Sequence, residues 1–106
     1  MNFDRLFLEL WTTYPDEREE LTRVKKTNAL YLIEGSIQIQ REWIEKTEAG
    51  IEAIGCTLCE ASILLEDLLE KQCKFLRLLE LRAKELRFKT GLRAQNQRYG
   101  SLVFGK

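Results

Sequence analysis

Residues 57–90 read TLCEASILLEDLLEKQCKFLRLLELRAKELRFKT and form the clearest helical pattern in the chain. Thr57 stands three residues before Glu60, which is the spacing of a capping box at a helix N-terminus. Gly55 before this stretch and Gly91 after it suit the left-handed residues that end helices. Because no proline or glycine interrupts the stretch, we predict one helix over residues 57–90.

The apolar residues of this helix follow a heptad rhythm in alternating steps of four and three, with one polar member. This seam comprises Leu65, Leu69, Gln72, Leu76, Leu79, Ala83 and Leu86. A second apolar row lies beside it and comprises Leu64, Leu68, Phe75, Leu78 and Leu86. Together they make a stripe wider than a two-stranded coiled coil needs, so we expect the helix to touch at least two others.

Two further helices precede this one. Apolar residues from Phe3 to Trp11 recur at helical spacing and predict an amphipathic helix over about 2–13. Its polar face lacks the Lys/Arg enrichment of interfacial membrane helices, so we expect it to dock on the other helices. Pro15 suits the first position of a helix over about 15–54. This helix carries its own seam and two candidate break points, Gly35 and Gly50. The seam is Leu30, Ile33, Ile37, Gln40, Ile44, Thr47, Ile51 and Ile54.

The two long helices are of comparable length, roughly 60 and 50 Å at 1.5 Å per residue. A tight turn at Gly55-Cys56 predicts an all-α fold, with a long antiparallel hairpin and the short N-terminal helix in one domain over 1–91. Residues 92–106 lack a helical stripe and are expected to be a mobile tail. A hairpin of two helices would leave part of each apolar stripe exposed to water, so we expect a homodimer with a four-helix core. The predicted self-association residues are Leu65, Leu68, Leu69, Phe75, Leu76, Leu79 and Leu86.

Composition narrows the class of protein. The chain has 106 residues, of which 44% are hydrophobic and 32% charged, as expected of a folded soluble domain. No apolar run approaches the roughly 20 residues that span a bilayer. The opening MNFDRLFLELW carries Asp4 and Glu9 and has no cleavage site. We therefore expect a cytoplasmic or nuclear protein that does not enter the membrane.

Catalytic and metal-binding chemistry has little support in the residues. The chain has no histidine, which is the commonest general base and metal ligand. Cys56 and Cys59 have C-x-x-C spacing, which leaves open a shared zinc site across a dimer, a redox pair or two small residues near a turn. Since no phosphate-binding loop or nucleophile motif is present, we predict a protein that is not an enzyme and needs no metal or cofactor.

Charge is distributed unevenly along the chain. Residues 1–70 hold 15 acidic and 7 basic side chains, and residues 71–106 hold 2 acidic and 10 basic ones. Five basic residues fall within about 100° of one another on the predicted 57–90 helix and just beyond it. They are Lys71, Lys74, Arg82, Lys89 and Arg93. Such a track would suit phosphates of duplex RNA or DNA without regard to sequence. The other interpretation is that acidic and basic helices pair and set the hairpin register.

These observations favour a self-associating helical binding protein that acts as an adaptor, scaffold or small regulator through helix packing. The partner would then be another protein as well as a second copy. The alternative is a dimeric, sequence-independent binder of duplex RNA or DNA. Its architecture would be similar to that of helical viral silencing suppressors that bind double-stranded RNA. No motif in the chain carries a family assignment.

Overall fold

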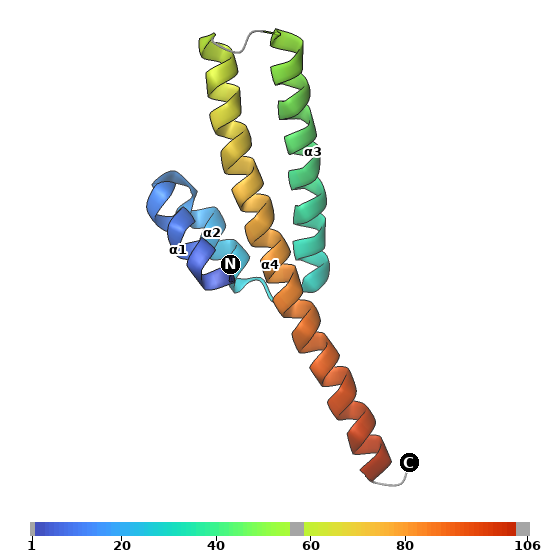
Figure 1. Ribbon diagram of the computed structural model, residues 1–106. Helices are drawn as coiled ribbons and strands as arrows, with labels where there is room; N and C mark the ends of the chain where they lie inside the picture. The colour runs from blue at the N-terminus through green and yellow to red at the C-terminus, as the bar shows by residue number, and fades with distance from the viewer. Residues whose placement is uncertain (1, 56–58, 104–106) are drawn as a thin grey trace.

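The computed structural model describes the backbone of residues 2–55 and 59–103 and the side chains of residues 2–55 and 59–89. Within these ranges the chain is all-helical, as predicted, and contains no strand. The elements are α1 (Phe3–Thr13), the 3-10 turn η1 (Pro15–Glu17), α2 (Arg18–Lys26), α3 (Leu30–Ile54) and α4 (Glu60–Val103). Helices α3 and α4 form a hairpin, and α1 and α2 lie on the other side of α4, beside its middle (Figure 1).

Helix α1 confirms the predicted amphipathic N-terminal helix. The Asn2 side chain caps it by accepting a hydrogen bond from the backbone N–H of Arg5 at 2.9 Å. Phe3, Leu6 and Leu10 are buried against the rest of the molecule. The stripe of this helix therefore packs within the chain, on α2 and α4.

The prediction of one continuous helix over 15–54 is wrong, because the chain leaves helical geometry after Lys26 and resumes it at Leu30. Neither Gly35 nor Gly50 marks the break, since both lie inside α3. At 100° per residue, the buried Leu21 and Val24 point more than 100° away from the buried side of α3. A straight helix would leave one of these two apolar faces in water, so the chain turns between them.

The α3–α4 hairpin confirms the predicted antiparallel pairing. Helix α3 ends at Gly55, whose φ of 66° lies in the left-handed region that glycine adopts without strain. The capping box predicted at Thr57 lies outside the described residues. Buried residues of α3 follow the predicted seam and include Ile33, Ile37 and Ile44.

Helix α4 is longer than predicted, because its backbone stays helical through Gly91 as far as Val103. A glycine inside a helix costs only about 1 kcal/mol relative to alanine, and the following residues LRAQ are good helix formers. Helical propensity therefore outweighs the stop signal at Gly91. The expected end of the helix at residue 90 is wrong.

The core lies in the half of the hairpin that is remote from Gly55. There α4 contacts α1, α2 and α3, and its buried residues meet those of all three helices. The buried apolar residues of this core are Phe3, Leu6, Leu10, Leu21, Val24, Ile33, Ile37, Phe75, Leu78, Leu79, Ala83 and Leu86. Helices α1 and α2 thus supply, within one chain, much of the cover that the sequence assigned to a second copy. No described helix is apolar enough over a sufficient length to cross a bilayer.

Gly35 offers a test of helix α3. A Cβ built at Gly35 meets nothing within 4 Å, and its backbone is helical. Gly35→Ala is expected to raise the free energy of unfolding by about 0.5–1 kcal/mol, because alanine loses less backbone entropy on folding. Chemical denaturation followed by helical circular dichroism measures this change. Gly55→Ala is the matched control and should destabilise, since Gly55 has a positive φ.

Candidate functional site

The predicted self-association residues do not form one surface. Phe75, Leu79 and Leu86 are buried in the core of the chain itself. Leu65, Leu69 and Leu76 are half-buried along the α3–α4 contact, and Leu68 is exposed. Of the seven, Leu68 is therefore the residue most available to another molecule.

The residues of the predicted basic track do not all lie on one open face. The Lys71 ammonium pairs with the Glu17 carboxylate at 3.1 Å and lies 6.0 Å from the centre of the Tyr14 ring. The Lys74 ammonium lies 3.6 Å from the Glu70 carboxylate of the same helix and 3.9 Å from the Glu9 carboxylate of α1.

Arg82 is the third member of the track and has a structural role. Only 6% of its surface is exposed. Its Nη2 donates hydrogen bonds to the backbone oxygen of Thr27 at 2.9 Å and to Asn28 Oδ1 at 3.0 Å. Lys89 is exposed, and the Arg93 side chain lies outside the described residues. Three of the five basic residues thus bind the chain's own elements.

Ion pairs across the hairpin follow the predicted pairing of acidic and basic segments in part. Arg87 of α4 pairs with Glu34 of α3 at 3.3 Å, as the charge distribution suggests. Arg41 and Glu80 also pair at 3.3 Å, with the signs reversed between the helices. All four side chains are well exposed, so each pair adds at most about 1 kcal/mol and mainly favours this register.

A groove of about 550 Å³ lies between α2 and α3, with α4 as its floor. Its exposed lining is mostly apolar, and its polar residues come from the α2 side, from α3 and from the α4 floor. The lining residues are Glu17, Glu20, Arg23, Val24, Ser36, Ile39, Gln40, Trp43, Leu68, Lys71, Gln72, Phe75 and Leu79. A groove of this shape, open along one side, is the described feature best suited to hold part of another molecule.

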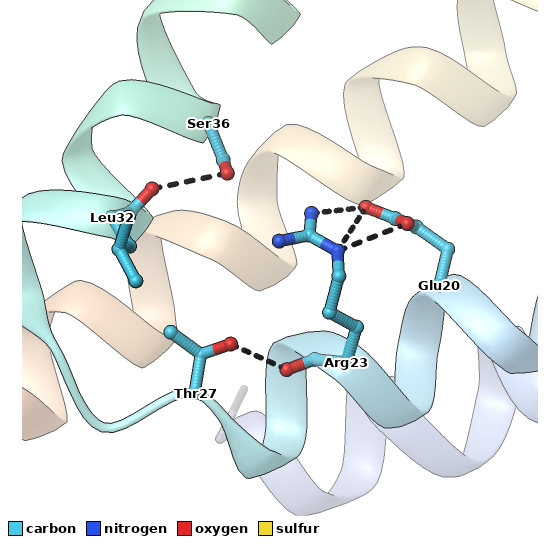
Figure 2. Close-up of polar contacts among 5 residues, drawn as sticks. All are labelled: Glu20, Arg23, Thr27, Leu32 and Ser36. Atoms are coloured by element: carbon cyan, nitrogen blue, oxygen red, sulfur yellow. Dashed lines mark hydrogen bonds and ion pairs between the residues drawn. The ribbon is translucent and has the colours of Figure 1, made fainter.

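The charged residues on the α2 side of the groove neutralise each other. Figure 2 shows the Arg23 guanidinium facing the Glu20 carboxylate, which accepts hydrogen bonds from Arg23 Nε at 3.1 Å. This hydrogen bond raises the pKa of Arg23 above its ordinary value, so the guanidinium stays charged. In the same view Thr27 Oγ1 donates to the Arg23 carbonyl at 2.7 Å, as Ser36 does to the Leu32 carbonyl inside α3. Since Glu17 pairs with Lys71, the four charges of the groove sum to zero.

The polar members of the two heptad seams meet on the groove floor. Gln40 Nε2 donates to the backbone oxygen of Gln72 at 3.0 Å. Gln72 Oε1 is buried and has no hydrogen-bond partner among the described residues. A polar layer of this kind fixes the register of a helical pair at some cost in stability.

Gln72→Leu is expected to raise the free energy of unfolding by about 1 kcal/mol, because it removes an unsatisfied buried acceptor. The Gln40 hydrogen bond goes to the backbone at position 72 and is retained. Urea denaturation of the variant and the wild type measures the difference. A loss of stability would contradict this prediction and would mean that the Gln72 side-chain amide forms a stabilising hydrogen bond.

An apolar surface continues from the groove toward the Gly55 end of the hairpin. We call it the open face and define it by Ile39, Trp43, Leu64 and Leu68, all of which are exposed. Trp43 is 53% exposed and Leu64 is 61% exposed, although both are large and apolar. Exposed apolar residues that cluster in this way typically mark an interaction site.

Sequence reasoning identified the α4 part of this face and missed the α3 part. The signal was present, because Ile39 and Trp43 are four residues apart and lie beside the predicted seam of α3. The flank that they occupy is uncharged from Leu32 to Trp43, with Lys46 next in the row, whereas the opposite flank carries Glu34, Arg41 and Glu48. An uncharged second row beside a helix seam is a usable indication of a second contact surface.

The described residues contain no group of three or more Cys, Asp or Glu side chains placed to hold a metal ion. Cys56 lies outside the described residues, so the C-x-x-C pair is not defined by this geometry; Cys73 is exposed. The site is thus an apolar groove on a helical hairpin. No protein-family model, curated protein or solved structure matches the chain.

Proposed function

We propose that this chain is a non-enzymatic helical binding protein, an adaptor, scaffold or small regulator that packs a partner's helix onto its hairpin. The open face carries this proposal, because Ile39, Trp43 and Leu68 stay exposed while lining one groove, and Leu64 continues the row one turn further along α4. A helix laid in an apolar groove is a recurring mode of protein recognition.

The arrangement of the N-terminal helices supports the same function. Helix α2 lies against α4 on one side of the groove, remote from Gly55, and nothing in the described chain takes its place nearer the turn (Figure 1). The half of the hairpin remote from Gly55 is therefore covered by a further helix, whereas no described helix covers the half near Gly55 in this way. A helix from a second molecule would cover that half as α2 covers the other.

Self-association stays a prediction, and it has a smaller surface than the sequence suggested. The open face and half-buried Leu65 and Leu69 remain for a second copy, while Phe75, Leu79 and Leu86 do not. The nucleic-acid alternative loses support for a similar reason, since Lys71, Lys74 and Arg82 are engaged within the chain. A gel shift with generic duplex RNA and DNA at low salt decides between this alternative and helix packing.

Trp43 provides the test of helix packing. The chain has two tryptophans, and Trp11→Phe leaves Trp43 as the sole indole while keeping an aromatic ring beside Phe7. We expect the Trp43 emission to shift to shorter wavelength when a helix covers it, because the indole leaves water. The measurement is a titration of this variant against its own concentration and against amphipathic helical peptides. An emission that neither titration moves would contradict the proposal.

A further inference from the structure

The open face has the dimensions of one short helix. On α3 it begins at Ile39 and runs toward Ile54, which ends the helix and is itself partly exposed. Those residues span about 22 Å at 1.5 Å per residue, the length of a helix of about 15 residues. The other wall comes from Leu64 and Leu68, one turn apart on α4. The occupant is therefore expected to present an apolar stripe about four turns long.

The half of the hairpin that bears this face is strongly acidic. Residues 42–70 contain eight acidic side chains and a single basic one, Lys46. No ion pair between described residues engages Glu42, Glu45, Glu48 or Glu52 of α3 or Glu60, Glu66 or Asp67 of α4. At the end of the face nearest α2 the charges are paired, Glu20 with Arg23 and Glu17 with Lys71, so the net negative charge lies toward the Gly55 turn. Glu60 lies four residues before Leu64 and Asp67 three after it, so these two flank the face, whereas Glu45, Glu48 and Glu52 lie on the far side of α3. An occupant that reaches toward the Gly55 turn therefore meets a net negative charge.

This field disfavours a second copy in the groove. Two such faces packed together would bring two segments of net charge −7 close to each other. Like charges placed together at an interface cost several kilocalories per mole and suppress the wrong partner. We propose that the occupant is a basic amphipathic helix of another protein, with Lys or Arg flanking an apolar stripe. This inference rests on the proposed helix-packing function and specifies its partner.

Three synthetic helices of about 16 residues test the charge requirement. They share one Leu-rich stripe and differ in carrying Lys, Gln or Glu at the flanking positions. Each is titrated into the full chain with Trp11→Phe, and Trp43 emission is followed. We expect the Lys helix to bind at least about tenfold more tightly than the Gln helix, and the Glu helix not to bind. Raising the salt from about 50 to about 500 mM should weaken the Lys helix by about tenfold or more.

Adjacent residues of α4 provide a matched pair of variants. Leu64 belongs to the open face, whereas Ile63 points about 100° away from it and is also 48% exposed. Leu64→Arg places a positive charge on the open face and should abolish the Trp43 response to the Lys helix. Ile63→Arg adds the same charge elsewhere and should keep at least half of the affinity. Since both side chains are exposed, neither variant is expected to unfold the chain, and circular dichroism verifies this.

The outcomes separate the two proposals. Equal binding of all three helices, or a Trp43 shift that follows self-association alone, would overturn the basic helix and leave helix packing standing. Binding of the Lys helix that is identical in Leu64→Arg and Ile63→Arg would place it outside the open face and likewise overturn the inference. No Trp43 shift with any helix or with concentration would remove both proposals. Selective, salt-sensitive binding that Leu64→Arg abolishes supports both.

Discussion

Arg82→Glu is expected to lower the free energy of unfolding by about 4 kcal/mol, which is much of the stability of a domain of this size. Arg82 donates to the Thr27 carbonyl and to Asn28 Oδ1, and its guanidinium lies 5.9 Å from the centre of the Phe3 ring. A glutamate there would be a buried anion facing two oxygen acceptors. The turn between α2 and α3 would lose the group that holds it against α4.

Lys89→Glu is the control for this variant, because it makes the same change in net charge on the same helix at an exposed position. Its effect on unfolding should stay within about 0.5 kcal/mol. Urea denaturation of both variants, followed by circular dichroism, gives the two values. If Arg82→Glu were as stable as Lys89→Glu, Arg82 would have to lie on an open surface, as the nucleic-acid alternative requires.

The burial of Arg82 was within reach of the sequence. Arg82 lies four residues after Leu78 and four before Leu86, both of which belong to the second apolar row. Residues at this spacing share one face of a helix, so that row passes through Arg82. Its charge was taken as a sign of exposure, whereas a long arginine side chain can lie in a core when part of its guanidinium finds acceptors. The Nη2 of Arg82 does so, while its buried Nε has no partner among the described residues.

The break between α2 and α3 was less evident but also had a signal. Heptad steps from Leu30 onward were regular, and no proline or glycine stands between Pro15 and Leu30. The phase of Leu21 and Val24, more than 100° from the later seam, was the only indication. A change in the phase of the apolar positions predicts that the helix must break, but it does not predict where the N-terminal segment will pack.

What the sequence predicted well was the part that local patterns decide: α1, the Gly55 turn and the seam of α3. What it missed depended on contacts between distant segments. The position of α1 and α2 beside α4 depends on contacts such as the Lys71–Glu17 ion pair. These two residues are 54 apart in the sequence, and the periodicity of a single helix does not indicate that they meet. The α3 part of the open face had a local signal in Ile39 and Trp43, but the extent of the face depends on where α2 stops, which the sequence did not indicate.

Leu78→Ala is expected to lower the free energy of unfolding by about 3 kcal/mol, which is the second largest effect after that of Arg82→Glu. Leu78 is fully buried, on the side of α4 that faces the N-terminal elements. Removing three carbon atoms from such a site loses their transfer free energy and leaves a cavity that the neighbouring helices fill only in part. Because these contacts lie within one chain, the loss should not depend on protein concentration.

Leu64→Ala makes the matched comparison, since it deletes the same atoms from the same helix at a position that is 61% exposed. We expect it to change the unfolding free energy of the unbound monomer by less than about 0.5 kcal/mol. Thermal unfolding of both variants at two concentrations tenfold apart gives the comparison. If Leu64→Ala were the costlier change, and more so at the higher concentration, Leu64 would lie in a stable dimer interface. The open face would then belong to a second copy, because only burial between chains makes an exposed leucine costly to remove.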